Sequence, residues 1–112
     1  MVAHIIDCER VFMYRGLSFA RNDKSVLPGF DENEWANEVD VSNRSMDSLL
    51  EEYQHARKAN ILFFENISDE ISKRKGKANN NDMSVRALGF IISGHEIHHM
   101  GILKERYLQA TY

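Results

Sequence analysis

The 112-residue chain contains only one cysteine, Cys8, one proline, Pro28, and six glycines. A single cysteine excludes a disulfide within the chain, which favours a reducing compartment. The scarcity of proline and glycine removes the usual helix breakers, and the remaining composition is rich in helix-forming residues. There is no internal repeat and no alternating strand pattern longer than a few residues. The sequence therefore predicts an all-α protein.

The sequence also lacks an apolar run long enough to span a bilayer and a recognisable N-terminal signal peptide. Its net charge of −3 offers no basic footprint for nucleic acid or for an anionic membrane surface. Apolar residues make up 43% and charged residues 28%, which is typical of a folded globular domain. We therefore expect a single cytoplasmic domain over residues 1–112, with no nucleic-acid partner and no membrane association.

Three segments show the three- and four-residue apolar spacing of amphipathic helices, namely 1–21, 46–66 and 85–108. Ser45 and Ser84 directly precede the second and third segments and are predicted N-caps. The first segment contains Gly16, which costs about 1 kcal/mol relative to alanine inside a helix. The sequence thus predicts three long helices.

The links between these helices predict how they run. Residues 22–43 are loop-like, with a helical turn at 33–37 and Trp35 as an anchor on the bundle. Residues 68–82 form a polar link, with a turn of helix at 68–72 and a loop over 73–81. The first link can run back along a helix of about 30 Å, which makes the first two helices parallel. The shorter second link predicts an antiparallel last helix. Because bundles normally close with four helices, a missing helix or a partner chain is expected to complete the core.

The last predicted helix carries the cluster His95-Glu96-Ile97-His98-His99. A four-residue spacing puts His95 and His99 on one face, about 6 Å apart along the helix axis. Two imidazoles placed in this way can bind one metal ion, whereas His98 lies about 100° round the helix. Such a pair needs a third ligand from elsewhere in the chain.

Two histidines lie outside that cluster. His55 stands beside Arg57 and Lys58 and is interpreted as a solvent-facing helix residue. His4 has apolar neighbours on most sides and, taken alone, would be interpreted as a core histidine. If the first and last helices are antiparallel, however, His4 approaches the His95/His99 pair. Cys8 shares the face of His4 and is predicted to be a small buried core residue, with a thiolate ligand as the alternative.

Three segments, taken together and in this order, resemble the DinB-like (DinB/YfiT) superfamily of metalloenzymes. They are Ala3-His4-Ile5-Ile6-Asp7-Cys8-Glu9-Arg10-Val11-Phe12-Met13-Tyr14-Arg15, Leu27-Pro28-Gly29-Phe30-Asp31 and Gly94-His95-Glu96-Ile97-His98-His99-Met100-Gly101-Ile102. The resemblance implies a four-helix bundle of the up-down-down-up type, with a long crossover between the first two helices present here. Nothing in this chain corresponds to the family's first helix, so the resemblance implies a domain that is N-terminally truncated.

The same resemblance implies one divalent metal ion, zinc or nickel, held by His4, His95 and His99. Asp7 and Glu96 would accept hydrogen bonds from the ligand N–H groups, although helix salt bridges or solvent exposure are equally good interpretations. Known members include transferases that use low-molecular-weight thiols. The implied function is therefore a metal-dependent thiol (S-)transferase, or a related hydrolase, acting on a small-molecule substrate. A homodimer is the implied assembly.

Two alternatives stay open at this point. His95-Glu96-x-x-His99 also satisfies the short zincin pattern of metalloproteases, with Glu96 as general base. Against it, only 13 residues follow His99, and Ile102 stands where the extended pattern requires glycine. The other alternative is a helical module that binds metal or a partner without catalysis. Arg15 and Arg106 fall on otherwise apolar lines and either line a pocket for an anionic substrate or extend to the surface.

Overall fold

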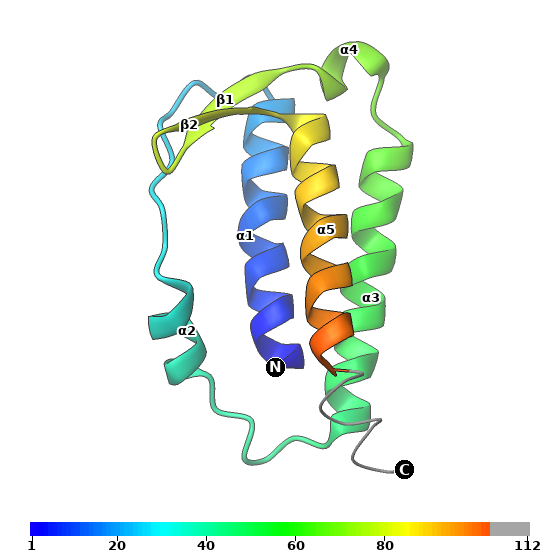
Figure 1. Cartoon of the computed structure of the whole chain (residues 1–112). Coiled ribbons are helices and arrows are strands. Elements are labelled where there is room, and N and C mark those ends of the chain that lie inside the picture. The colour runs from blue at the N-terminus through cyan, green and yellow to red at the C-terminus, as the bar shows by residue number, and fades with distance from the viewer. Residues whose placement is uncertain (104–112) are drawn as a thin grey trace.

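The computed structural model describes the backbone of residues 1–103 and the side chains of residues 1–94. Three long helices form its body (Figure 1), joined by two short helices and one β-hairpin. In chain order the elements are α1 (Val2–Ala20), α2 (Glu32–Glu38), α3 (Met46–Glu65), α4 (Asp69–Ser72), β1 (Lys75–Ala78), β2 (Asn81–Ser84) and α5 (Val85–Leu103). The mostly helical fold and its three long helices are confirmed, while the predicted continuation of the last helix to residue 108 lies outside the described residues.

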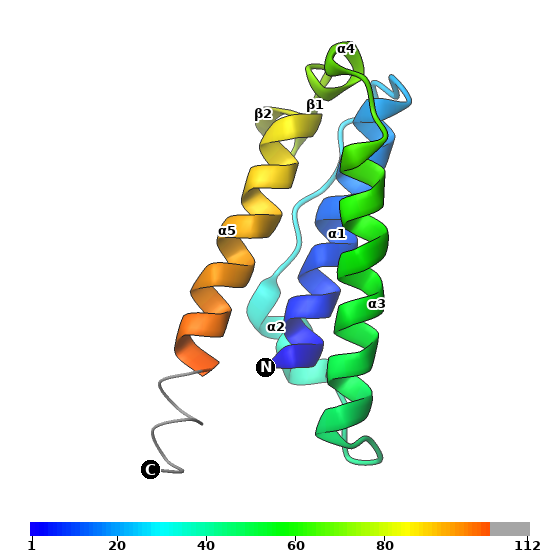
Figure 2. The same ribbon diagram turned by 90° about the vertical axis from the view of Figure 1, so that its right-hand side faces the viewer.

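The directions of the long helices also follow the prediction. Helices α1 and α3 run the same way, and α5 runs opposite to both (Figures 1 and 2). Helix α1 packs against α5 along one side and against α3 along another. The link of residues 21–45, which we call the crossover, returns along the bundle from the end of α1 to the start of α3 and carries α2 (Figure 1).

The core lies mainly between α1 and α5. On α1, Cys8, Phe12 and Phe19 are buried, and on α5 they meet Val85, Leu88 and Ile92. A second, smaller cluster joins the start of α1 to α3 through Val2, Ile6 and Leu49. Helix α1 is thus the central element, because both clusters contain its residues. No helix in the described part of the chain is long and apolar enough to cross a bilayer.

Short-range hydrogen bonds explain where the helices begin. The Ser45 hydroxyl accepts a hydrogen bond from the Ser48 amide at 3.1 Å, and the Ser84 hydroxyl accepts one from the Ala87 amide at 3.1 Å. Both predicted N-caps are therefore confirmed. Asp31 performs the same task for α2, and Ser68 does so for α4.

The loop predicted over residues 73–81 is wrong. Strands β1 and β2 form an antiparallel hairpin, with Ala78 paired to Asn81 across a two-residue turn. Asn79 and Asn80 occupy the turn with φ of 51° and 62°, which a type I′ turn requires at both positions. Asparagine tolerates this left-handed conformation, so the local sequence allows the turn. The strands themselves carry no apolar alternation and therefore gave no strand signal.

The hairpin fixes both neighbouring segments. The Leu27 amide donates to the Lys77 carbonyl at 2.9 Å, and the Asn79 amide donates to the Leu27 carbonyl at 3.0 Å. The Arg74 guanidinium donates to the Ala20 carbonyl at 2.6 Å, at the C-terminal end of α1. These bonds hold the first part of the crossover at the end of the bundle where α1 finishes.

Candidate metal site and the crossover pocket

His4 lies in the first turn of α1 and is partly buried. Because α5 is antiparallel to α1, the later turns of α5 lie at the same end of the bundle as the start of α1 (Figure 1). His95, Glu96, His98 and His99 belong to α5, but their side chains lie outside the described residues, as does Arg106. The ligand set His4, His95 and His99 therefore stays a prediction.

Cys8 is fully buried beside His4. Its Sγ lies 3.7 Å from His4 Nε2 and 3.9 Å from His4 Nδ1. Burial and the neighbouring carboxylates of Glu32 and Asp7 raise the pKa of the Cys8 thiol to about 12. The thiol is therefore protonated at neutral pH, and it points to Glu32 Oε1 at 4.0 Å. The prediction of a buried core cysteine is confirmed.

Glu32 was not identified from the sequence as a neighbour of His4 and Cys8. It is the first residue of α2, which begins there because the Asp31 side chain accepts hydrogen bonds from the amides of Asn33 and Glu34, both at 3.0 Å. The Asp31-x-x-Glu34 spacing is a local signal for this helix start. That signal does not say which part of α1 the helix will face.

The donor set around His4 suits zinc or nickel, because imidazole is a favoured ligand of both metals. Among the residues whose side chains are described, no three His, Cys, Asp or Glu groups are arranged to hold a metal ion. A metal bound at His4 therefore needs further ligands from beyond residue 94. The sequence supplies three histidines there, all on α5.

The crossover runs alongside α1 in a regular register. The Arg15 guanidinium donates to the Pro28 carbonyl at 3.1 Å, the Phe12 ring meets the Phe30 ring at 6.5 Å, and Cys8 meets Glu32. Every second residue of this stretch of the crossover therefore meets α1 about one helical turn closer to the start of α1. Within the crossover, the Trp35 ring packs on the Phe30 ring with the centroids 4.9 Å apart. Trp35 itself is 45% exposed, so its role as an anchor on the bundle stays a prediction.

Arg15 does not extend to the surface. It is 7% exposed, and its guanidinium lies 5.9 Å from the Phe12 ring centroid and 5.7 Å from that of Phe30. Burial lowers the pKa of Arg15, and the charge of Glu32 partly offsets that effect. The guanidinium stays charged at neutral pH, because the pKa of arginine is very high. Arg15 therefore places a positive charge inside the contact between α1 and the crossover.

A pocket of about 400 Å³ lies between α1 and the crossover, and we call it the crossover pocket. Its walls are almost wholly apolar and aromatic, because the charged residues that line it expose mainly carbon atoms to it. The lining residues are Asp7, Arg10, Val11, Tyr14, Arg15, Leu27, Pro28, Gly29, Phe30 and Trp35. A pocket of this size and character suits a small organic molecule.

Helices α1 and α3 are joined by polar contacts that the sequence did not reveal. Glu9 is only 2% exposed, forms an ion pair with Arg57, and accepts a hydrogen bond from Asn60 at 2.8 Å. The Arg57 guanidinium also lies 5.9 Å from the Tyr53 ring centroid. By contrast, the His55 side chain is 75% exposed, which confirms its predicted solvent-facing position.

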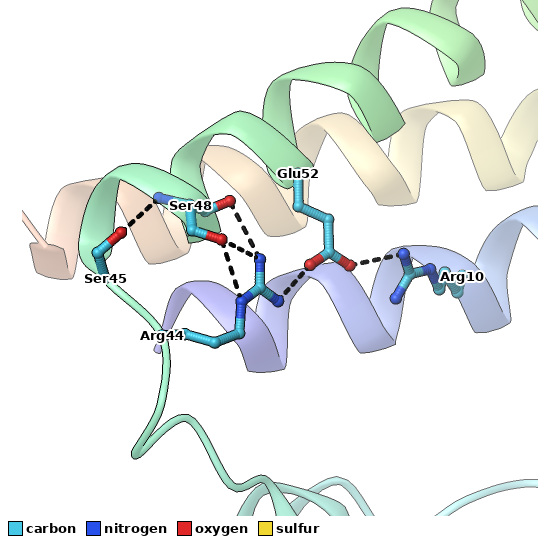
Figure 3. Close-up of polar contacts among 5 residues, drawn as sticks. All are labelled: Arg10, Arg44, Ser45, Ser48 and Glu52. Atoms are coloured by element: carbon cyan, nitrogen blue, oxygen red, sulfur yellow. Dashed lines mark hydrogen bonds and ion pairs between the residues drawn. The ribbon is translucent and has the colours of Figure 1, made fainter.

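A second polar bridge lies near the start of α3. Figure 3 shows the Glu52 carboxylate between Arg10 of α1 and Arg44 of the crossover, at 2.7 Å and 2.5 Å. Arg44 also donates to the Ser48 carbonyl and hydroxyl, beside the Ser45 cap. Hydrogen bonds from Arg44 and Arg10 hold the pKa of Glu52 below its usual range. This bridge ties the end of the crossover to the two parallel helices.

Comparison with known proteins identifies the family. A model of the DinB superfamily matches residues 1–103, which include α1, the crossover and the described part of α5. A search of curated proteins and a search of solved structures found no significant match. The family match covers nearly the whole chain and includes all three histidines of the predicted metal site. The chain therefore belongs to the DinB superfamily.

Proposed function

We propose that this chain binds one divalent metal ion, zinc or nickel, through His4, His95 and His99. The observation that carries the proposal is the antiparallel packing of α5 against α1, because the later turns of α5 then share one end of the bundle with His4. Three histidine ligands leave a coordination position open, as in catalytic rather than structural zinc sites. A bound metal would supply Lewis acidity toward a thiol or a water molecule.

Neighbouring carboxylates would support the ligands. Asp7 lies one turn after His4 on α1 and is partly buried, so it is our proposed acceptor for the imidazole N–H group that does not face the metal. Glu96 is the corresponding proposal on α5. Such acceptors fix the ring orientation and raise the basicity of the ligand. Cys8, buried and protonated, is assigned to packing rather than to metal binding.

The activity we propose is metal-dependent transfer of a low-molecular-weight thiol to an electrophilic small molecule. The thiol sulfur forms a bond to the electrophilic carbon, the leaving group departs with the bonding electrons, and the thiol proton passes to solvent. Hydrolysis of a related substrate, with water in place of the thiol, is the neighbouring reaction. The crossover pocket supports a small-molecule substrate, because it opens between α1 and the crossover, beginning one turn from His4 at Asp7.

Metal analysis of the purified protein tests the ligand set. Wild type should carry one divalent ion per chain, and His4→Ala should lose most of it. His55→Ala is the matched control, because this exposed histidine lies on α3 and should not affect the metal content. Unchanged metal content in His4→Ala would remove that residue from the site.

A rate assay tests the reaction. With 2-mercaptoethanol and monobromobimane, wild type should show a metal-dependent rate that His99→Ala loses and Cys8→Ser keeps. Metal binding without any rate above the uncatalysed reaction would instead support a non-catalytic metal-binding protein. Peptide hydrolysis that disappears in Glu96→Gln would support the metalloprotease interpretation.

We further propose that a second copy of the chain completes the bundle. A groove of about 490 Å³ lies between α3 and α5, bordered by the exposed apolar side chains of Ile61 and Phe90, the latter 74% exposed. Its rim carries both signs of charge, with Arg57 and Arg86 near Glu65 and Asp69. Such a rim suits the self-complementary contact of a two-fold dimer.

Sedimentation velocity tests this assembly. Wild type should sediment as a dimer, and Phe90→Glu should sediment as a folded monomer, because a carboxylate would be buried in the contact. Val26→Glu is the matched control, because it places the same carboxylate on an exposed apolar residue of the crossover that does not line the groove. A wild-type monomer at high concentration would refute the dimer.

A further inference from the structure

The crossover pocket is a cavity whose exposed atoms are almost all carbon. Charged residues do line it, but they contribute mainly the carbon parts of their side chains. The Arg10 guanidinium is paired with Glu52, and the Arg15 guanidinium donates to the Pro28 carbonyl. The charged ends of both arginines are therefore engaged in these contacts. A ligand in this pocket would gain apolar contact and almost no hydrogen bonds.

Such a lining selects strongly among ligands. An ionised group would lose its hydration in the pocket without gaining a partner, which is unfavourable. A peptide segment that entered the pocket would leave its backbone N–H and C=O groups unpaired, for the same reason. The volume of about 400 Å³ is in the range of small-molecule sites. The pocket therefore favours an uncharged small molecule over an ion or a peptide.

Aromatic rings stand on both sides of the pocket. Tyr14 lines it from α1 and is 61% exposed, and Phe30 and Trp35 line it from the crossover. Trp35 is itself 45% exposed, so both Tyr14 and Trp35 keep apolar surface that a ligand would cover. Contacts between aromatic rings stabilise beyond the area that they bury. An aromatic ligand thus suits these walls better than an aliphatic one.

The crossover wall of the pocket is held in place by contacts behind it. The Leu27 amide donates to the hairpin, the Pro28 carbonyl accepts from Arg15, and the Phe30 ring meets the edge of the Phe12 ring. Because these contacts form within the chain, the pocket is shaped before any ligand arrives. A preformed site lowers the entropy that binding must overcome.

We propose that the crossover pocket binds an uncharged aromatic small molecule, with its ring between Tyr14 on one side and Phe30 and Trp35 on the other. The identification of this molecule with the electrophilic substrate rests on the proposed function. In that case its reacting group lies at the Asp7 end of the pocket, one turn from His4. Binding of the aromatic ring itself needs no metal.

The fluorescence of Trp35 provides the test, because it is the only tryptophan in the chain and lines the pocket. Metal-free wild type is titrated at pH 7 with toluene and with two ions of similar shape, benzoate and benzylammonium. Toluene should bind saturably and at least about tenfold more tightly than either ion. An ion that binds as tightly as toluene, or a toluene signal that does not saturate, would overturn the proposal.

Two variants change the pocket, and each has a matched control at Leu17, which is exposed on α1 and lies outside the pocket. Val11→Phe should fill the pocket and abolish toluene binding, whereas Leu17→Phe should keep it. Tyr14→Glu changes a well-exposed position that folding should tolerate, and its carboxylate should weaken toluene binding severalfold, whereas Leu17→Glu should not. Unchanged toluene binding in both pocket variants would contradict this location.

Three further measurements separate this pocket from the other proposals. His4→Ala should lose its metal and still bind toluene, so the metal site and the pocket can fail independently. In the thiol-transfer assay toluene should raise the KM for monobromobimane, and an unchanged KM would overturn the identification with the substrate. Tyr14→Glu should sediment as wild type does. A change in its oligomeric state would show that a second chain covers the pocket, which would overturn the small-molecule proposal.

Discussion

The buried carboxylate of Glu9 allows a quantitative prediction about the contact between α1 and α3. Glu9 is 2% exposed, and the side chain of its partner Arg57 is 16% exposed. Arg57→Met removes the Arg57 cation but keeps much of the apolar stem, so the Glu9 carboxylate stays in a desolvated position and loses its ion pair with Arg57. Breaking a buried ion pair on one side costs about 3–5 kcal/mol, and we expect about 3 kcal/mol here because Asn60 still donates to Glu9.

A double-mutant cycle separates the interaction energy of the Glu9–Arg57 pair from the free energy needed to bury each charged side chain. Glu9→Leu should destabilise by about 1–3 kcal/mol, because Arg57 keeps its contact with Tyr53 and has partial access to water. In Glu9→Leu/Arg57→Met no charge remains buried, so the double variant should recover to within about 1–2 kcal/mol of wild type. The effects of the two substitutions are therefore expected to be strongly non-additive.

Urea denaturation followed by far-ultraviolet circular dichroism at pH 7 measures these differences. Arg10→Met is the matched control, since it breaks an ion pair between the same two helices at the surface, where the Arg10 side chain is 60% exposed. Arg10→Met should lower the free energy of unfolding by less than about 1 kcal/mol. If Arg57→Met costs no more than Arg10→Met, then water reaches the Glu9 carboxylate and the reasoning from burial is wrong.

Three further predictions concern the bridge, the glycines and the metal. Arg44 and Arg10 lower the pKa of Glu52, so the ionised Glu52 carboxylate should stabilise the fold above its ordinary pKa, and this stabilisation should be lost as pH falls through the lowered pKa. At pH 7, Glu52→Gln should therefore be less stable than wild type by up to about 1 kcal/mol. In urea titrations this difference in the free energy of unfolding should shrink below about pH 4. Gly76→Ala should lower stability by about 1–3 kcal/mol, because its Cβ would meet the buried Phe19 ring, whereas Gly16→Ala should raise it by up to about 1 kcal/mol in the same assay. Chelation should lower the melting temperature of metal-loaded wild type but leave that of His4→Ala unchanged; an equal shift in both would contradict binding at His4.

The helices could be predicted from the sequence because their signals are local. Apolar spacing identified the three long helices, and Ser45 and Ser84 marked two of their starts. The lengths of the links were enough to predict which helices are parallel. Family resemblance assigned the chain to the DinB superfamily, which the family match confirmed.

The contacts between distant segments could not be predicted in this way. Glu9 and Arg57 are 48 residues apart, and Cys8 and Glu32 are 24 apart, so their meeting depends on how far each helix is shifted along its neighbour. The hairpin was missed because its stability comes from backbone bonds to Leu27 and from the Asn79-Asn80 turn rather than from an apolar pattern. Arg15 fits two interpretations from the sequence alone, because only the folded crossover, through Pro28 and Phe30, buries its guanidinium.

The crossover explains why these separate observations occur on one side of α1. Parallel neighbouring helices require a long connection, and this connection must return along the bundle over a distance of about 30 Å. Its hydrogen bonds to the hairpin fix its start, and the Arg44 bridge fixes its end. Between these points it lies over the face of α1 that runs from Arg15 through Phe12 to Cys8. The topology thus creates a lined pocket that extends toward the proposed metal site. If a small molecule binds there as proposed, substitutions in the crossover should weaken its binding before they alter the stability of the three long helices.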